Sequence, residues 1–510
     1  MKKQINQLET LKIRLKRGGG KEKIKQQYLK GKRTARERIN ILLDHKSFTE
    51  LNTFMTKNTN VRSVENLEGD GVITGYGKIK EKLVFVYAQD FTVHGGSLGE
   101  IQAKKIVKIM DMAFENKAPI IGLIDSGGAN IQEGVKALDG YGQILYRNCI
   151  YSGIIPQISV ILGPCAGGAV YSPALCDFVF MVKNISKMFI TGPRVIEEVT
   201  GEYIDEEKLG GTNIHSKESG VAHFVEETEE EILKRVREVV SYIPDANKGN
   251  DTFAKEEIQA PVTGNLLEIV PTERKKTYNM HHVIEHIVDK GSILEVQKEY
   301  ARNMIVSFAK VGGQVVGIVA NNPKVKAGAI DIDASDKCAR FVRFCDAFKI
   351  PLIVLEDVGG FLPGIHEEQK GLIRHGAKVI FAFSEATVPK ITVIIRKAYG
   401  GAFVALNSKA LGADFVFAWP SAEIAVMGAE GAIQILHTKE LAENKEGNFK
   451  QKKIEEYYEK YANPYLAASF GMIDEMISPT DTRKYLISSL QTLKNKSKHL
   501  PINRHNNLPL

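Results

Sequence analysis

Residues 119–128 read PIIGLIDSGG, and residues 351–360 read PLIVLEDVGG. Each stretch is a run of apolar residues that ends in an aspartate and then a pair of glycines. Such continuous aliphatic runs are typical of strands that are buried on both faces of a sheet, and a glycine pair after the run predicts a turn. The two copies lie 232 residues apart. A repeated strand and turn at this distance indicates that one fold occurs twice.

Two further pairs of segments keep nearly the same offset. The run ISVIL at 158–162 leads to Gly167 and Gly168, and the run ITVII at 391–395 leads to Gly400 and Gly401, at an offset of 233. The segments 78–89 and 310–321 share a third pattern at an offset of 232. Three signals in the same order predict two duplicated copies of one fold.

Strands and helices alternate within each copy. Residues 102–113 predict a helix, with Ile106, Ile109 and Met110 close to one face, and this alternation favours an α/β architecture. The 510 residues fit two domains. We place these domains at 1–250 and 251–510, because residues 241–265 are rich in Pro, Asn, Lys and Gly and lack apolar periodicity.

Composition and cysteine spacing favour a cytoplasmic protein. No apolar run is long enough to span a bilayer, and the charged N-terminus lacks the apolar core of a signal peptide. The five cysteines form no Cys-x-x-Cys pair, so neither a zinc ribbon nor a redox motif is indicated. Reduced structural thiols fit this pattern.

The net charge of +7 lies largely in the first 38 residues, which include GKRTARER at 31–38. A charge run of this kind is often a solvated helical arm. It could instead form a basic rim that attracts an anionic ligand such as a CoA phosphate. We expect no nucleic acid as a partner, because the run has no interleaved aromatic residues and no recognisable binding module.

The glycine pairs suggest a chemistry for both copies. Reaction at the α-carbon of an acyl-CoA passes through an enolate, and backbone N–H groups at a helix N-terminus can stabilise its negative oxygen. Residues 163–172 and 397–404 both place a glycine pair between a strand and small residues that open a helix. Either motif alone could simply allow close packing of strand and helix, but their matching positions suggest paired oxyanion holes.

Other candidate residues are weaker. Cys165 has no readable histidine partner, so a structural thiol is favoured. Asp125 and Asp357 could act as bases, although an aspartate at a strand end more often caps the next turn. His281, His282 and His286 lack the further ligands of a metal site, and the chain has no dinucleotide fingerprint and no phosphate loop.

At these motifs the chain resembles the biotin-dependent acyl-CoA carboxyltransferases, which include the β subunits of propionyl-CoA and acetyl-CoA carboxylases and the α subunit of methylmalonyl-CoA decarboxylase. The resemblance covers nearly the whole chain and is carried by the stretches 31–39, 88–92, 163–175, 335–346, 361–364, 373–378 and 422–428. It implies two tandem crotonase-like (ClpP/crotonase) domains. It also implies a hexamer, built as a trimer of dimers, with the active site at a dimer interface.

The resemblance also implies roles for individual residues. The catalytic hole for the thioester enolate would be Gly167 and Gly168 in the N-terminal domain, on the acyl-CoA side. The hole for the ureido oxygen of biotin would be Gly401 and Ala402 in the C-terminal domain. Substrate-binding positions would be Ala129, Ala169, Phe403, Val404, Asn322, Lys324 and Arg343, and biotin-side positions would be Gly359, Gly360, Phe361 and Gly364.

The activity that the resemblance implies is transfer of CO2 between carboxybiotin and the α-carbon of a short acyl-CoA, propionyl-CoA or methylmalonyl-CoA. Acyl-CoA is then the substrate, biotin arrives on a separate carrier protein, and this chain binds no metal or ATP. Partners would be a biotin carboxylase, a biotin carboxyl carrier protein or both, with a membrane involved only indirectly in a decarboxylase pump.

Three departures from the family pattern leave alternatives open. Asn130 stands where the family usually has Arg, Gly359 stands where it usually has Pro, and residues 365–371 read IHEEQKG. These departures leave open another substrate or a catalytically altered structural homologue. A methylmalonyl-CoA decarboxylase or transcarboxylase subunit is a further alternative, because the carboxyl transfer step is reversible. A free-standing hydratase or isomerase would explain one copy but not the duplication.

Overall fold

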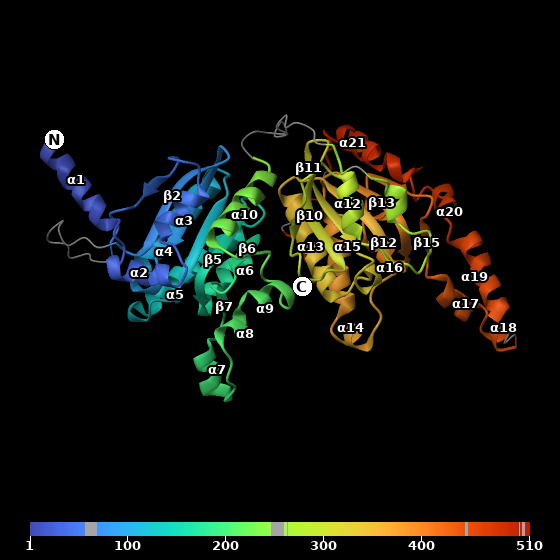
Figure 1. Ribbon diagram of the computed structural model, residues 1–510, viewed down its shortest axis with the longest axis horizontal. Helices are drawn as coiled ribbons and strands as arrows, with labels where there is room; N and C mark the ends of the chain where they lie inside the picture. The colour runs from blue at the N-terminus through green and yellow to red at the C-terminus, as the bar shows by residue number, and fades with distance from the viewer. Residues whose placement is uncertain (57–68, 246–259, 263, 444–446, 499, 502–504) are drawn as a thin grey trace. The chain divides into compact units, whose positions relative to one another are not determined.

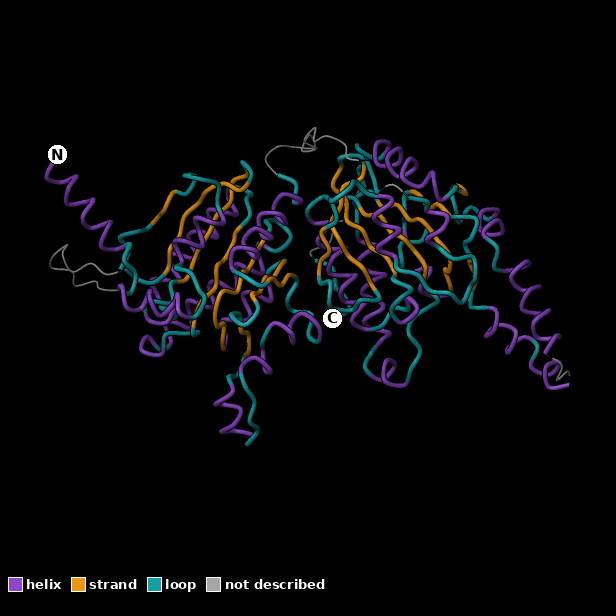
Figure 2. The backbone as a smooth tube through the Cα atoms, viewed as in Figure 1, coloured by secondary structure: helices purple, strands orange, loops and turns teal. Residues whose placement is uncertain are grey.

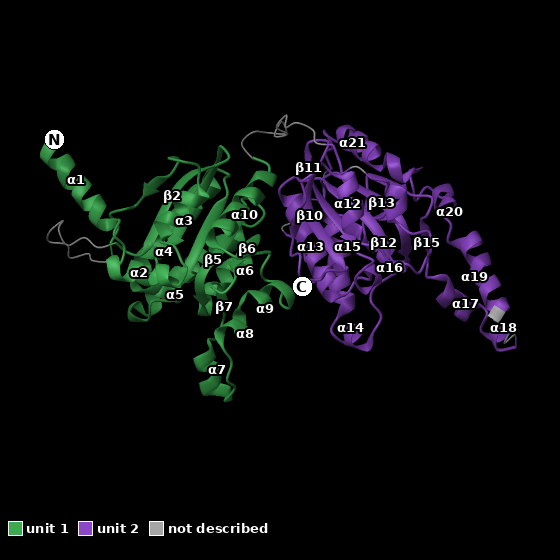
Figure 3. Ribbon diagram, viewed as in Figure 1, with its two compact units in different colours: residues 1–249 green, residues 250–510 purple. Residues whose placement is uncertain are grey.

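The computed structural model describes residues 1–510 except 57–68, 246–259, 263, 444–446, 499 and 502–504. The chain divides into two compact units, residues 1–249 and 250–510 (Figure 3). The predicted boundary between residues 250 and 251 lies outside the described residues. None of the described helices combines the length and the apolar character needed to cross a bilayer.

The first unit is built around one mixed sheet (Figure 1). Its strands are β1 Thr49–Leu51, β2 Val72–Ile79, β3 Lys82–Gln89, β4 Ile120–Ser126, β5 Gln157–Ala166, β6 Phe178–Val182, β7 Lys187–Phe189 and β8 Phe224–Glu226. They lie in the order β1-β2-β3-β4-β5-β6-β8, and β7 also pairs with β5. The strands from β3 to β8 run parallel, and β1, β2 and β3 pair antiparallel.

The second unit repeats this arrangement strand for strand. Its strands are β9 Leu294–Val296, β10 Met304–Val311, β11 Gln314–Asn321, β12 Leu352–Val358, β13 Lys390–Tyr399, β14 Phe415–Ala418, β15 Glu423–Ala425 and β16 Glu475–Met476. The order β9-β10-β11-β12-β13-β14-β16, with β15 on β13, is that of the first sheet. The prediction that both halves share one strand order is therefore confirmed.

Helices cover the sheets, as the tube drawing shows (Figure 2). The first unit contains α1 Lys2–Leu15, α2 Lys21–Leu29, α3 Ala35–Leu42, α4 Glu100–Glu115, α5 Val135–Tyr151, α6 Tyr171–Leu175, α7 Pro193–Thr200, α8 Glu206–Gly210, α9 Thr212–Lys217 and α10 Glu229–Tyr242. The second contains α11 Leu266–Ile269, α12 Met280–Ile287, α13 Ile332–Ala347, α14 Ile365–Gln369, α15 Leu372–Glu385, α16 Gly400–Ala405, α17 Ala429–Leu436, α18 Thr438–Glu443, α19 Gly447–Tyr461, α20 Pro464–Ser469 and α21 Thr482–Thr492.

The sheet strands are apolar at successive positions because both of their faces are covered. In β4 every residue is buried, as is usual for parallel strands between helix layers. Ile120 and Ile124 join the core with α4 and α5, so Ile121 and Leu123 face the opposite layer. In the second unit Ile353 and Leu355 share a core with α12 and α21, and Val354 and Glu356 therefore point to the other face.

Candidate active site

The predicted glycine pairs lie at equivalent places in the two units. A short 3-10 helix, Gly167–Val170, follows β5, and α16 follows β13. Gly167 and Gly400 both adopt left-handed φ angles, 66° and 59°, which glycine adopts without strain. The first N–H groups of a helix have no intrahelical acceptor, so each turn presents backbone donors at the end of its strand.

The space in front of both turns is open to a ligand. A Cβ atom on Gly168 would meet nothing within 4 Å among the described residues outside its own turn, and one on Gly401 would meet the Phe361 ring at 3.8 Å. Both glycines are exposed. A negatively charged oxygen could therefore approach either turn, which is the geometric requirement for an oxyanion hole.

The repeat also shows how the two predicted holes correspond. Because Gly400 is equivalent to Gly167, Gly401 is equivalent to Gly168 and Ala402 to Ala169. The predicted second hole, Gly401 with Ala402, is therefore shifted by one residue relative to the first, Gly167 with Gly168. Ala169 and Ala402 are both buried beneath their turns, so they contribute backbone rather than side chain to the open surface.

A second turn lies beside each glycine turn and differs between the units. Ala129 forms an isolated bridge with Leu98, and Phe361 forms the matching bridge with Ile330. A Cβ atom on Gly376 of α15 would lie 2.9 Å from the Phe361 ring, so this ring fills the space between α15 and Gly401. The space in front of Gly401 is therefore bordered by an aromatic ring, whereas Ala129, at the equivalent position of the first unit, has only a methyl group.

The remaining predicted biotin-side residues lie near this second turn. Gly360 has a φ of 138°, and its carbonyl accepts the N–H of Ile330 at 3.1 Å. Gly359 is exposed and has open space around it, and Gly364 immediately precedes α14.

Asn130, which replaces the usual Arg, lies in the first unit. Its side chain accepts the N–H of Gln132 at 3.1 Å and so caps a short turn.

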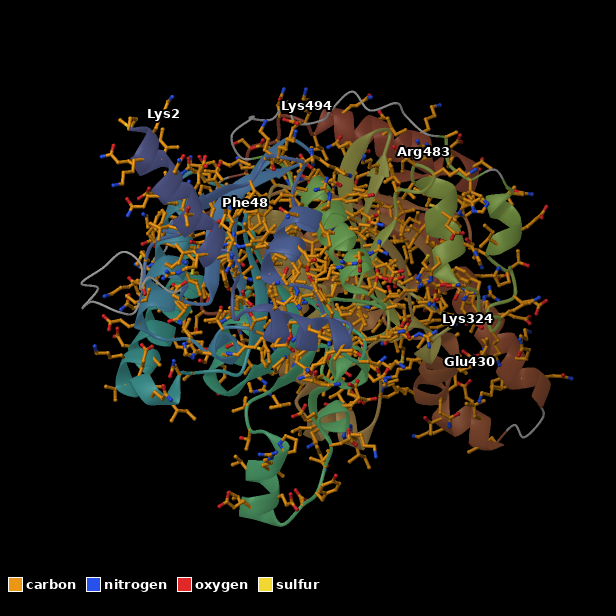
Figure 4. The ribbon with its side chains drawn as sticks, turned by 60° about the vertical axis from the view of Figure 1, so that its left-hand side comes forward. Lys2, Phe48, Lys324, Glu430, Arg483 and Lys494 are labelled. Carbon is orange, nitrogen blue, oxygen red and sulfur yellow. The ribbon has the colours of Figure 1, made fainter. Side chains whose placement is uncertain are left out.

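The predicted substrate-binding residues are not all brought together. Phe403 is half-buried against the core of the second unit, and Val404 is 39% exposed. Asn322 is buried, and its side-chain oxygen accepts the N–H of Met280 at 3.3 Å. Lys324 is exposed (Figure 4).

Arg343 lies apart from the glycine turn of its own unit. It is the twelfth residue of α13 and forms an ion pair with Glu385, the last residue of α15. At the helical rise of about 1.5 Å per residue, this position is about 16 Å along α13 from its first residue. The structure therefore does not bring Arg343 to the turn that carries Phe361.

The two strand-end aspartates are paired with cations. Asp125 contacts Lys32 at 2.7 Å and Arg38 at 2.8 Å, and Asp357 contacts Arg396 at 3.1 Å. All of these side chains are buried, and the paired carboxylates are not free to act as bases at the open turns. Both interpretations of the basic run, a solvated arm and a phosphate-binding rim, are wrong for Lys32 and Arg38, because carboxylates engage both residues inside the protein.

The cysteine and histidine candidates have structural contacts. Cys165 is fully buried, and burial raises the pKa of its thiol to about 12, so it stays protonated and a poor nucleophile at neutral pH. His281 contacts Glu295 at 3.0 Å, and His286 contacts the carbonyl of His282 at 2.7 Å.

Glu356 is a buried residue that sequence analysis did not single out. Its side chain is fully buried on β12, and neither carboxylate oxygen has a hydrogen-bond partner among the described residues. Burial raises the pKa of this carboxyl well above its usual value. The repeat could have revealed it, because the equivalent residue of the first copy is Ile124.

Comparison with known proteins identifies the family. The carboxyl transferase domain matches residues 26–508. The chain belongs to the carboxyl transferase family. A putative propionyl-CoA carboxylase beta chain of Bacillus subtilis is 54% identical over all of both chains. The methylmalonyl-CoA decarboxylase subunit alpha of Propionigenium modestum is 49% identical and covers 100% of this chain and 99% of its own length.

A solved carboxyl transferase structure shares the fold. Transcarboxylase 12S, with methylmalonyl-coenzyme A and methylmalonic acid bound, matches with a TM-score of 0.95 and 46% identity. The match covers 100% of this chain and 98% of that one. Together with the repeated sheet order, this similarity confirms the prediction of two tandem crotonase-like domains.

Proposed function

We propose that this chain is the carboxyltransferase subunit of a biotin-dependent acyl-CoA carboxylase and acts on propionyl-CoA and methylmalonyl-CoA. The observation that carries the proposal is the pair of open glycine turns, one at the end of β5 and one at the end of β13. Two substrates that each develop a negatively charged oxygen require two such sites. Relatives named for propionyl-CoA and methylmalonyl-CoA support this choice of substrate.

The first unit would act on the acyl-CoA. The N–H groups of Gly167 and Gly168 stabilise the enolate oxygen that forms when the α-proton leaves the thioester. The small side chain of Ala129 leaves room beside this turn. Asp125 and Asp357 are both held in ion pairs, so neither carboxylate serves as the base in this mechanism.

The second unit fits the biotin side. Its turn at Gly401 is open, and the flat Phe361 ring lies beside it, which suits a planar ureido group. When bound there, carboxybiotin would supply CO2 and a nitrogen that can take up the α-proton. The chain contributes N–H groups at Gly401 and Ala402, which stabilise negative charge on the ureido oxygen. Gly359, Gly360 and Gly364 would shape the same pocket.

The reaction can run in either direction, so a decarboxylase or transcarboxylase subunit is the second candidate, supported by the decarboxylase relative. Biotin would arrive on a separate carrier protein, and a biotin carboxylase would be a partner in the carboxylase. We propose a cytoplasmic hexamer, which the hexameric transcarboxylase 12S supports. A catalytically inactive homologue is less well supported, because both turns are open.

Two valine variants test the proposed function. Gly168 and Gly401 lack the left-handed φ of their neighbours, so Gly168→Val and Gly401→Val should fold. A valine would occupy the space that the ligand oxygen needs, and loss of one oxyanion donor typically costs roughly 100- to 1,000-fold in rate. The assay is carboxyl transfer from methylmalonyl-CoA to free biotin, together with calorimetric binding of CoA.

The two variants should fail differently. Both should abolish transfer, but Gly401→Val should leave CoA binding unchanged. Gly431→Val is a matched control, because among the described residues outside its own helix backbone its new Cβ atom would meet only the flexible Met427 side chain, at 3.8 Å. Full activity of an assembled Gly401→Val protein would remove the second turn from the mechanism.

We also propose that Val404, an exposed apolar side chain beside the second glycine turn, contacts the acyl group of the substrate and selects a short chain. Propionyl-CoA should then be preferred over acetyl-CoA by about 1–3 kcal/mol in kcat/KM, which is the usual contribution of one methylene. Steady-state kinetics with both acyl-CoAs measures this preference, and a preference for long chains would contradict it.

A further inference from the structure

The strand that leads into each glycine turn is interrupted at the same place. Between β4 and β5 the pairing jumps from Ile124 with Ile161 to Ser126 with Cys165. Between β12 and β13 it jumps from Glu356 with Ile394 to Val358 with Ala398. A bulge of this kind leaves backbone groups without ladder partners and re-aims the strand. In each unit the strand-end aspartate lies opposite the bulge, two residues before a glycine pair.

In the second unit the bulged strand itself satisfies the aspartate. The backbone N–H of Lys397 donates to Asp357 Oδ1 at 3.1 Å, and Arg396 Nε donates to Asp357 Oδ2 at 3.1 Å. Arg396 also donates to the carbonyl of Lys276 at 2.8 Å. These bonds tie the end of β12 to the bulge of β13, three residues before Gly400.

The first unit cannot make either of these bonds from its own strand. The residue equivalent to Lys397 is Pro164, which has no N–H, and the residue equivalent to Arg396 is Gly163, which has no side chain. A Cβ atom at Gly163 would lie 2.0 Å from Asp125 Oδ1 and 2.7 Å from Lys32 Nζ. Position 163 therefore requires glycine, because the Asp125 carboxylate and the Lys32 ammonium group occupy the space that a side chain would need.

The N-terminal segment supplies the missing donors. Lys32 Nζ donates to Asp125 Oδ1 at 2.7 Å. This bond takes the place of the one that the Lys397 N–H donates to Asp357 Oδ1 in the second unit. Arg38 donates to Asp125 Oδ2 at 2.8 Å and also to the bulge carbonyl of Leu162 at 2.9 Å. Glu229 at the start of α10 holds the same guanidinium at 2.6 Å. The two cations are therefore matched by two carboxylates inside the protein.

We infer that Lys32 and Arg38, acting through Asp125, are positioning residues that hold the bulge of β5 and so aim the Gly167 turn at the acyl-CoA enolate. Asp357 and Arg396 do the same for the Gly400 turn. The inference rests on the proposed function, and it assigns a role to the N-terminal segment 31–38. The turn after β4 packs directly against the turn after β5. A Cβ atom on Gly128 would lie 3.0 Å from the carbonyl oxygen of Ala166, the residue before Gly167.

The test uses the full-length protein with Lys32→Met, Asp125→Asn and the double variant. Displacement of a reacting group by about 1 Å can cost roughly 100-fold, so each single variant should lower kcat for transfer from methylmalonyl-CoA to free biotin by about 10- to 100-fold. Calorimetric affinity for CoA and KM should change little, because the hole acts on the transition state. Lys32→Arg should restore part of kcat, since it keeps the charge.

Lys30→Met is the matched control, because Lys30 lies two residues away and is exposed. It should leave kcat unchanged. The double variant should lose less than the product of the two single losses, because both act through one contact. The inference is overturned if correctly assembled Lys32→Met and Asp125→Asn proteins keep the wild-type kcat, or if KM rises while kcat is unchanged. If the wild-type protein shows no transfer, the proposed function itself fails, which is a separate outcome.

Discussion

Glu356 and Ile124 occupy equivalent positions of the two copies, and only one of them suits its surroundings. Both side chains point to the helix layer on the same face of their sheets, and both are buried. Ile124 joins an apolar core, whereas Glu356 has two oxygen atoms without a partner among the described residues. A buried polar group in this state costs about 1–3 kcal/mol. Glu356 therefore destabilises the second unit.

This cost should depend on pH. Burial raises the pKa of the Glu356 carboxyl above its usual value of 4.5, so the native state keeps the proton at pH values where the unfolded chain has lost it. The contribution of Glu356 to the free energy of unfolding should therefore fall as pH rises above about 4.5. Glu356→Ile, which copies the first unit, should raise the stability at pH 8 by about 1–3 kcal/mol.

Denaturant unfolding at pH 5 and pH 8 measures this difference. The gap between Glu356→Ile and the wild type should be larger at pH 8. Glu356→Gln is the control for shape, and it should remove the pH dependence while keeping the polar group. Equal gaps at both pH values would show that Glu356 is ionised in the native state or has a partner.

Helices α4 and α13 are equivalent elements, and each contains a buried lysine that bonds to a neighbouring segment of its unit. Lys105 of α4 contacts Asp70 at 3.0 Å. Lys337 of α13 instead donates to the carbonyls of Gln297 and Tyr300 at 2.9 and 2.7 Å. Both copies keep the buried lysine, but among the described residues only Lys105 has a carboxylate in direct contact. Burial lowers the pKa of Lys337 to about 8.

The anchoring of α13 should accordingly strengthen in alkali. Between pH 8 and the unfolded value of 10.5, the unfolded chain binds more protons at this site than the native state does, so the free energy of unfolding contributed by Lys337 should rise with pH. Lys337→Met should lose this rise and be destabilised, because the carbonyls of Gln297 and Tyr300 lose the hydrogen bonds that Lys337 donates. Thermal unfolding between pH 7 and pH 9.5 checks this, and parallel curves for both proteins would contradict it.

At the scale of the whole molecule, each unit carries exposed apolar side chains on one of its helices. An apolar stripe follows the exposed side of α5, where Val135, Leu138 and Tyr146 are 62–78% exposed. Helix α15 carries exposed Ile373 and Ile380 at the spacing of two helical turns. Stripes of this kind usually mark an interface. In the proposed hexamer, a second copy of this chain would cover the stripe.

A charge in the stripe should weaken that assembly. Leu138→Glu places a carboxylate on a surface that assembly would bury, and burying a leucine side chain is worth about 1.5–3 kcal/mol. Light scattering at micromolar concentration should show smaller species than for the wild type. Gln491→Glu adds the same charge at an exposed position of α21 and should leave the mass unchanged. An unchanged mass for Leu138→Glu would exclude this stripe from the interface.

The sequence by itself determined the duplication, the alternation of strands and helices and the positions of the glycine turns. These depend on local rules: buried strands must be apolar at successive positions, and a turn with positive φ requires glycine at Gly167 and Gly400. The tertiary structure alone decided which charges meet. Lys32 lies 93 residues from Asp125 along the chain, and no periodicity links a basic run to a bulge in a distant strand. Burial decides whether such a charge is solvated, ligand-binding or structural, and burial follows from how the elements pack together.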